Sequence, residues 1–203
     1  IHSVTPKAGL LAQFAAWISG ISIRVHTFTG QVWATKQGMS RFFLKMLDRV
    51  IALCTTRALA DSASQREFLI TEKVISADKI EVLGQGSISG VDVQRFQPNP
   101  EVRQAVRKQL GFSDEDVLAL FVGRLNRDKG VLDLIRAFAQ ISQRMSSLKL
   151  LLVGPDEADI ASEINRLSGN NMDIKILGST SRPHYYMASA DFLCLPSYRE
   201  GLG

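Results

Sequence analysis

The chain has 203 residues, of which 45% are hydrophobic and 22% are charged, so it carries enough apolar material for one or two globular cores. Its two cysteines, Cys54 and Cys194, lie inside apolar runs, and its three histidines are scattered. These spacings exclude a disulfide framework and a clustered metal site, and they predict buried thiols in a reducing compartment.

The formal net charge of +4 is distributed unevenly along the chain. Residues 1–60 contain seven Lys or Arg and one acidic residue, so they carry +6 and the remainder carries −2. A basic half predicts an anionic surface or substrate for that half, which leaves lipid headgroups, phosphates and nucleic acid open.

The chain begins without an initiating Met, and residues 1–4 are typical of a strand entered midway. Residues 8–23 form an uncharged, mostly apolar run that is short for a membrane span and has no convincing leader or cleavage site around it. The pattern predicts a helix over 9–19, a stop at Gly20 and a strand over 21–28.

From Met39 onward, apolar residues recur at helical spacing, and Arg41, Lys45 and Arg49 repeat every four residues elsewhere on the same helix. Two interpretations fit this pattern. A basic amphipathic helix can lie on an anionic membrane, and a half-buried helix can equally present a solvated basic face.

A short strand is predicted over 59–62, and the capping-box spacing of Ser62 and Gln65 predicts that a helix begins there. Another strand over 79–83 is followed by Gly84-Gln85-Gly86-Ser87. Glycine-rich backbone of this kind can approach a ligand or a partner domain closely.

Residues 117–130, VLALFVGRLNRDKG, carry the strongest functional signal in the chain. The first six are continuously apolar, which predicts a strand covered by helices on both faces. Arg124, Arg127 and Lys129 follow within a few residues. The carboxyl end of a strand is where α/β sheets bind ligands, so these cations predict an anionic ligand, of which phosphate fits best. The alternative is that they are ordinary solvated loop charges.

The turn-rich residues 96–100 precede a predicted charged helix, and we place a domain boundary at 95–112. Beyond it strands and helices alternate with short connections, which predicts a parallel sheet of Rossmann type. The expected elements are strand 117–122, helix 130–145, strand 148–153, helix 158–168, strand 173–177, helix 183–189 and strand 191–195. The fold class is therefore α/β, with two Rossmann-like halves.

Several motifs match one family in order and spacing: Gly90-Val91-Asp92 with Phe96, VGRL…KG at 122–130, LLVGP at 151–155 and SADFLCLPSYREGLG at 189–203. On these motifs the chain resembles part of a family 4 glycosyltransferase with the two-domain GT-B architecture. The last motif resembles the start of the family's E-x7-E motif. The family's early elements, including its glycine-rich loop, and the second glutamate have no counterpart here.

The resemblance implies a domain layout. Residues 1–94 correspond to the later part of the N-terminal, acceptor-side domain, 95–112 to a linker, and 113–203 to a donor-binding domain cut before the end of the E-x7-E motif. We expect this segment to be inactive by itself.

The resemblance also assigns residues to the donor. Arg124 and Lys129 correspond to the cations that bind the donor diphosphate, where they stabilise the charge that develops on the leaving phosphate. Glu200 corresponds to the glutamate that contacts hydroxyls of the donor sugar, and with those two cations it makes up the expected catalytic set. The remaining expected donor-binding residues are Gly123, Gly154, Gly178, Ser179, Gly201, Leu202 and Gly203.

The acceptor side departs from the family pattern, because Thr29-Gly30 stands where many relatives have His-Gly. Thr29 and Gly30 are still expected to face the catalytic cleft, and Gly86 and Ser87 are weaker candidates. His26 lies three positions early and is interpreted as packed. The structural expectations are that Asp92 caps the linker and that Asp191 and Pro196 support the fold.

The resemblance implies transfer of a sugar from a nucleotide-diphosphate donor to an unidentified sugar or lipid-linked acceptor in bacterial surface polysaccharide or glycolipid synthesis. It further implies retention at the anomeric carbon, no metal, no cofactor, and a cytoplasmic enzyme with peripheral contact at the inner face of the plasma membrane. The alternative is a non-catalytic nucleotide- or phosphate-binding α/β module. Nucleic-acid binding is disfavoured, because the basic half lacks interleaved aromatic residues.

Overall fold

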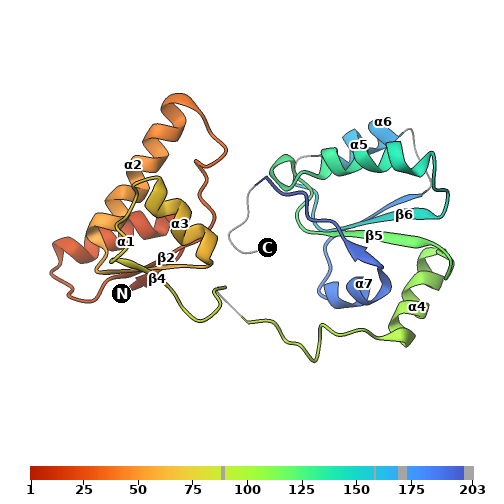
Figure 1. The fold of residues 1–203 in the computed structure, drawn as a ribbon, viewed down its shortest axis with the longest axis horizontal. Coiled ribbons are helices and arrows are strands. Elements are labelled where there is room, and N and C mark those ends of the chain that lie inside the picture. Colours follow the sequence, from red (N-terminus) through yellow and green to blue (C-terminus); the bar gives the residue numbers. More distant parts are fainter. Residues whose placement is uncertain (88–89, 158, 169–172, 199–203) are drawn as a thin grey trace. The chain divides into compact units, whose positions relative to one another are not determined.

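The computed structural model describes residues 1–87, 90–157, 159–168 and 173–198. The chain divides into two compact units, residues 1–90 and residues 91–198 (Figure 1). Both units are parallel α/β sheets with helical connections, which confirms the predicted fold class.

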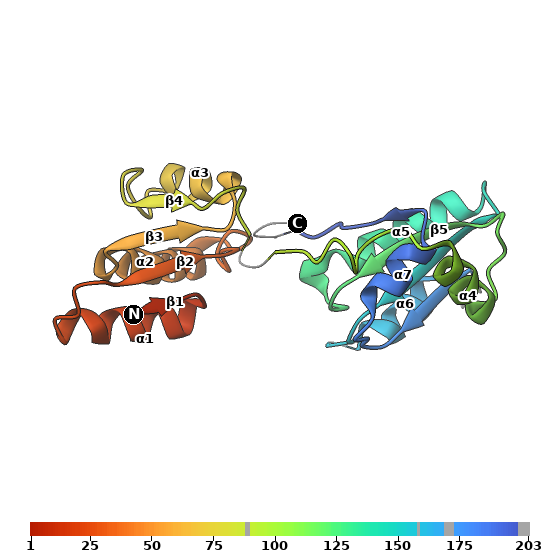
Figure 2. The ribbon, with the colours of Figure 1, turned by 90° about the horizontal axis from the view of Figure 1, so that it is seen from below.

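The first unit is a four-stranded parallel sheet in the order β1-β2-β3-β4, and Figure 2 shows its strands stacked in that order. Because consecutive strands are neighbours, each helix is a crossover between adjacent strands. The elements are β1 (His2–Ser3), α1 (Pro6–Ile18), β2 (Val25–Phe28), α2 (Gly38–Cys54), β3 (Arg57–Ala60), α3 (Ala63–Thr71) and β4 (Ile80–Val82).

The core of the first unit fills the space between the sheet and the helices. Its buried residues are Phe28, Trp33, Ile51, Ala52, Ala58, Ala60, Leu69, Val74, Ile75 and Ile80. Helix α3 begins as predicted, since the Ser62 hydroxyl accepts a hydrogen bond from the Gln65 backbone N–H at 3.1 Å. It ends at Thr71, because Lys73 takes a left-handed conformation with φ 54°.

The second unit is a four-stranded parallel sheet in the order β7-β6-β5-β8. The bounds of β5, β6 and α7 agree with the predicted strands and helix. The elements are α4 (Pro100–Leu110), β5 (Val117–Val122), the 3-10 helix η1 (Arg127–Lys129), α5 (Val131–Ser142), β6 (Leu148–Val153), α6 (Ile160–Ser168), β7 (Ile174–Leu177), α7 (Pro183–Ser189) and β8 (Phe192–Leu193).

Helices cover both faces of this second sheet (Figure 1). Helices α5 and α6 bury Ile135 and Ile164 against one face, together with Leu150 and Leu152 of β6. Helices α4 and α7 pack on the other face, where Leu151 is buried. Burial on both faces explains why β5 and β6 are continuously apolar rather than alternating.

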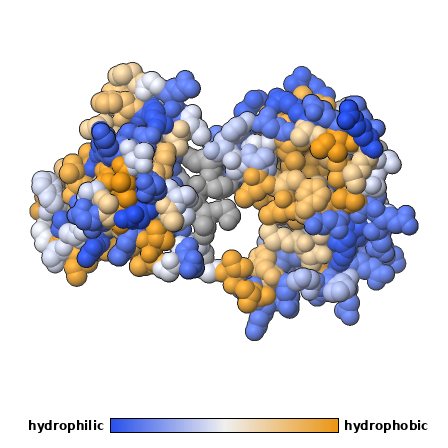
Figure 3. Space-filling model, in the orientation of Figure 1, coloured by the Kyte–Doolittle hydropathy of each residue, from blue (hydrophilic) through white to orange (hydrophobic). Residues whose placement is uncertain are grey.

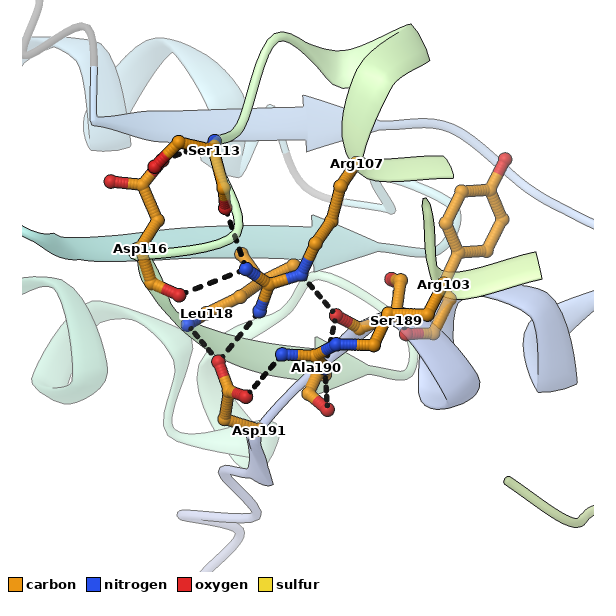
Figure 4. Close-up of polar contacts among 9 residues, drawn as sticks. Arg103, Arg107, Ser113, Asp116, Leu118, Ser189, Ala190 and Asp191 are labelled. Atoms are coloured by element: carbon orange, nitrogen blue, oxygen red, sulfur yellow. Dashed lines mark hydrogen bonds and ion pairs between the residues drawn. The ribbon is translucent and has the colours of Figure 1, made fainter. Parts of the chain in front are cut away.

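The predicted linker contains a helix that is firmly packed. Arg107 of α4 is only 1% exposed and donates to the Asp191 carboxylate at 2.7 Å (Figure 4). Arg103 donates to the other carboxylate oxygen at 2.6 Å, and the Leu118 N–H donates at 2.7 Å to the oxygen that Arg107 contacts. Residues 100–110 therefore belong to the second unit, and Asp191 has the structural role expected of it.

The ionisation of Asp191 reflects these contacts. Desolvation raises the pKa of this carboxyl, but the hydrogen bonds from Leu118 and Arg103 and the charges of Arg107 and Arg103 outweigh it, so the pKa lies below its ordinary value. The carboxylate is thus held in the charged form that α4 requires.

Candidate functional site

The strand order of the second unit defines where a ligand binds. Along the sheet β7-β6-β5-β8, the strands are third, second, first and fourth in chain order, so the direction of winding reverses between β5 and β8. Parallel α/β sheets bind ligands outside the carboxyl ends of the strands at such a switch point. The residues that follow β5 and β8 are therefore the candidate site.

Two glycines allow the loops after β5 and β6 to touch at this edge. Gly154 has φ 150°, and a Cβ placed on it would lie 1.8 Å from the Gly123 carbonyl oxygen. Leu125 is fully buried, and its N–H donates to the Pro155 carbonyl at 2.8 Å. The backbone on both sides of Arg124 is consequently held in place, which fixes the position of the Arg124 Cα atom.

The loop after β8 closes on the start of α5. The Tyr198 N–H donates to the Asp128 carbonyl at 3.0 Å, and the Tyr198 hydroxyl hydrogen-bonds the Asp133 carboxylate. A Cβ on Gly130, which has φ 67°, would lie 2.1 Å from the Pro196 carbonyl oxygen. These contacts join the two sides of the switch point, and they give Pro196 the structural role expected from the sequence.

The hydrogen bond between Tyr198 and Asp133 changes the ionisation of both groups. It is the largest cause that lowers the pKa of the Asp133 carboxyl and raises the pKa of the Tyr198 phenol. The carboxylate therefore stays charged and the phenol stays protonated at neutral pH, so this link persists under ordinary conditions.

Arg124 lies at this edge, exposed and paired with a carboxylate. Its guanidinium is 3.1 Å from the Glu157 carboxylate, and the Arg124 side chain is 56% exposed. The Asn126 side-chain amide donates to the same Glu157 oxygen at 3.2 Å. Solvent-exposed ion pairs of this kind contribute little to stability, so a phosphate can replace Glu157 at small cost.

Lys129 lies in η1, directly before the left-handed Gly130. Its backbone N–H donates to the Asn126 side chain at 3.1 Å, so Asn126 caps the 3-10 helix while it also holds Glu157. Arg127 pairs with Glu163 of α6 at 2.8 Å. The cations of the predicted loop therefore lie together, and two of them pair with carboxylates: Arg127 with Glu163 of α6, and Arg124 with Glu157 of the loop before α6.

The expected donor-binding residues do not all come together. Gly123, Arg124 and Gly154 are joined at the switch point, whereas Gly178 and Ser179 are exposed at the end of β7, one strand beyond β6. Glu200, Gly201, Leu202 and Gly203 lie outside the described residues.

Glu157 was missed by the sequence reasoning. It follows β6, the neighbour of β5 in the parallel sheet, and residues after adjacent strands meet at one edge. This adjacency could have identified it, because strands β5 and β6 were both predicted with their observed bounds.

The expected acceptor-side residues also meet at a carboxyl edge, that of the first unit. The Gln65 side-chain amide donates to the Thr29 carbonyl at 2.9 Å. The Ser87 N–H donates to the Asp61 carbonyl at 2.6 Å, and a Cβ on Gly86 would lie 2.3 Å from the same oxygen. Asp61, at the end of β3, thus lies between the loops that follow β2 and β4, and the sequence reasoning did not single it out.

His26 is packed, as interpreted from its position. It is 1% exposed, its Nδ1 lies 2.8 Å from the Ser3 hydroxyl, and its ring meets Phe28 edge-on at 4.6 Å between centroids. Burial, with a smaller contribution from His2, lowers the pKa of His26 to about 4. It is therefore neutral at physiological pH and belongs to the core.

The basic residues of α2 are tied to the end of α3, which corrects the picture of a free basic stripe. Arg41 and Lys45 both pair with Glu72, at 2.7 and 2.6 Å, and both lie over the Trp33 ring. Arg49 donates to the Lys73 carbonyl at 2.9 Å. These cations hold helices together and are only partly presented to solvent.

The described residues offer neither a clustered metal site nor a membrane-spanning helix. Within the ranges that the structure describes, no group of three or more His, Cys, Asp or Glu side chains is arranged to hold a metal ion. No helix in that part of the chain is long and apolar enough to cross a bilayer.

A parallel sheet whose switch point carries cations and close-packed glycine loops has the architecture at which α/β proteins commonly bind phosphate-bearing ligands. Residues 102–203 match the family described as "Glycosyl transferases group 1". The chain belongs to this family.

Individual glycosyltransferases are similar to this chain over its whole length. The chain is 31% identical over 206 residues to the capsular polysaccharide biosynthesis glycosyltransferase CapM of Staphylococcus aureus, covering all of this chain and 53% of CapM. It is 26% identical over 207 residues to the UDP-Gal:alpha-D-GlcNAc-diphosphoundecaprenol alpha-1,3-galactosyltransferase of Escherichia coli, covering all of this chain and 52% of that enzyme. The chain thus spans about half the length of these curated relatives.

Solved structures show the same fold. Anabaena Alr3699/HepE in complex with UDP and glucose superposes with a TM-score of 0.78 at 21% identity, over 97% of this chain and 52% of that chain. The lipopolysaccharide glycosyltransferase WaaG superposes with a TM-score of 0.69 at 17% identity, over 92% of this chain and 56% of that chain. The fold is that of the GT-B glycosyltransferases.

Proposed function

We propose that the protein transfers a sugar from a nucleotide-diphosphate donor to an acceptor, and that the second unit binds the donor diphosphate at its switch point. The observation that carries this proposal is Arg124, exposed at the end of β5 and paired only at the surface with Glu157. Two relatives support the donor class, since one is named for UDP-Gal and another was solved with UDP.

The chemistry follows from the charge that develops during transfer. When the bond between sugar and phosphate breaks, negative charge grows on the departing diphosphate. Arg124 and Lys129 would stabilise this charge where it develops, and they would supply the positive charge that a metal supplies elsewhere. We therefore propose metal-independent transfer that retains the anomeric configuration, with the leaving phosphate accepting the acceptor's proton on the same face.

For the acceptor we propose a sugar linked to a lipid diphosphate, used in surface polysaccharide synthesis at the cytoplasmic face of a membrane. The Escherichia coli relative is named for a diphosphoundecaprenol-linked sugar and CapM for capsular polysaccharide biosynthesis, and both names support this class. The support for membrane contact by helix α2 comes from exposed apolar side chains rather than from the predicted basic face. Met39, Phe42 and Phe43 are 67%, 56% and 60% exposed. Figure 3 shows hydrophobic side chains at the surface of both units.

The test of the donor site is Arg124→Ala in the full-length enzyme, with Arg166→Ala as the control. Arg166 is also exposed and pairs only loosely with Glu163, at 3.9 Å, so both variants lose one surface cation of the second unit. Turnover of UDP-galactose, UDP-glucose and GDP-mannose is measured with N-acetylglucosaminyl-diphospho-farnesol as acceptor.

We expect Arg124→Ala to lower activity by roughly 100-fold or more, as the loss of a charge-stabilising donor does, and Arg166→Ala to leave it within about 2-fold. Both melting temperatures should stay near that of the wild type. Equal activity in the two variants would contradict the assignment, and nucleotide binding without any transfer would favour the non-catalytic module.

A further inference from the structure

Asp61 is an unusual residue within the first unit. It follows β3, an interior strand of the sheet, and is 5% exposed. Within the part of the chain that the structure describes, its Oδ1 atom is buried and has no hydrogen-bond partner. Only three buried side-chain atoms of the described residues share this property, and Asp61 is the one carboxylate among them.

Such a carboxylate is costly to the fold. A buried carboxylate oxygen that accepts no hydrogen bond destabilises the fold, and native proteins leave few buried polar groups unsatisfied. Burial accordingly raises the pKa of Asp61, and the hydrogen bond from its own N–H only partly offsets this. Since the carboxylate destabilises the folded chain, its presence points to a use outside folding.

The backbone N–H and carbonyl of Asp61 are both hydrogen-bonded, whereas its Oδ1 accepts no hydrogen bond within the described residues. The Asp61 N–H donates to the Phe28 carbonyl at 3.3 Å, and the Asp61 carbonyl accepts from the Ser87 N–H at 2.6 Å. These bonds place Asp61 at the carboxyl edge, with the Thr29 loop on one side and the Gly86 loop on the other.

The loop beside Asp61 contains three residues with positive φ angles, two of them glycines and one a serine. Gly84 and Gly86 have φ 55° and 96°, and Ser87 has φ 76°, a left-handed conformation that few non-glycine residues adopt. Strain of this kind concentrates at ligand sites, where the surrounding structure holds it. There is no room for a Cβ at Gly86, because the loop lies directly against the Asp61 backbone.

We propose that the Asp61 carboxylate accepts hydrogen bonds from hydroxyl groups of the acceptor sugar. A carboxylate only accepts, so its ligand must donate, and a neutral polyol supplies donors without adding charge. Asp61 lies in no carboxylate or histidine cluster among the described residues, so the surroundings favour a hydroxyl donor over a metal ion. This inference rests on the proposed transfer reaction and adds a residue that recognises the acceptor.

The test is Asp61→Asn in the full-length enzyme, because asparagine keeps the shape and removes the charge. Three quantities are measured: transfer to N-acetylglucosaminyl-diphospho-farnesol, hydrolysis of the donor by water, and the melting temperature. Asp48→Ala serves as the control for a partnered buried carboxylate, since Asp48 is 5% exposed and accepts from the Trp33 indole N–H at 2.7 Å.

We expect Asp61→Asn to lower kcat/KM for the acceptor by roughly 10- to 100-fold, the range for a hydrogen bond to a charged group. Donor hydrolysis should stay within about 2-fold, because water needs no such recognition. The melting temperature should stay the same or rise, since the charge of a carboxylate with an unsatisfied buried oxygen is removed, whereas Asp48→Ala should lower it by leaving an indole N–H unpaired.

A purely structural role predicts the opposite pattern. The inference is overturned if Asp61→Asn lowers the melting temperature as Asp48→Ala does, if transfer is unchanged, or if hydrolysis falls in parallel with transfer. Should the wild type neither transfer nor hydrolyse any donor, the proposed function fails, and the melting comparison alone decides whether the Asp61 carboxylate destabilises the fold.

Discussion

The link between α4 and the second sheet can be tested by removing its carboxylate. In Asp191→Ala, Arg107 loses its charged partner while remaining 1% exposed, and the Leu118 N–H loses its acceptor. Arg107 keeps hydrogen bonds to the Ser189, Ser113 and Asp116 carbonyls, so its guanidinium stays largely solvated by the protein (Figure 4).

Breaking a buried ion pair by removing one partner costs about 3–5 kcal/mol, and orphaning a backbone N–H costs about 1–3 kcal/mol, but neighbouring effects do not add fully. Because the Asp191 side chain is 32% exposed, water screens part of the loss. We therefore expect a decrease of about 3 kcal/mol in the opening free energy of the second unit.

Hydrogen exchange measures this decrease locally. A loss of about 3 kcal/mol corresponds to a roughly 100-fold decrease in protection of the α4 and β5 amides, and the first unit serves as an internal reference. Asp114→Ala, which removes an exposed carboxylate of the same unit, is the matched control. A decrease below about 1 kcal/mol, or an equal loss in both units, would refute the reasoning.

The remaining predictions concern pH, packing and the membrane. The pKa of His26 is lowered to about 4 in the folded chain, so its contribution to stability is complete above the unfolded pKa of about 6.5. About 3 kcal/mol of stability is lost as the pH falls from 6.5 toward 4. The urea midpoint of His26→Gln should lack that part of the pH dependence, and a pH dependence equal to that of the wild type would show that another group titrates. Gly154→Ala should destabilise the second unit by at least about 2 kcal/mol in urea unfolding, because its Cβ would lie 1.8 Å from a carbonyl oxygen, whereas Gly178→Ala, with nothing within 4 Å, should be close to neutral. In sedimentation with phosphatidylglycerol vesicles, the double change of Phe42 and Phe43 to Ser should weaken binding without changing the affinity for UDP, and equal sedimentation of both proteins would remove α2 from the contact.

The sequence by itself determined the bounds of several elements and the cationic character of the loop after β5. Strands such as β5 and β6 are recognisable because each is a run of apolar residues bounded by turn residues, and this signal is local. The cations between β5 and α5 are equally local, so the loop that holds Arg124 and Lys129 was found together with its strand. The motifs by which the chain resembles its family fall in the same segments.

The tertiary structure decided which of these residues meet. The order β7-β6-β5-β8 creates the switch point, and it places Glu157 against Arg124 although 33 positions separate them. Glu72 reaches Arg41 across 31 positions and converts an apparent basic face into a helix contact. Such pairings depend on strand order and helix packing, which no local pattern encodes. Asp61 shows the same limit, because only the folded sheet reveals that its buried Oδ1 has no hydrogen-bond donor among the described residues.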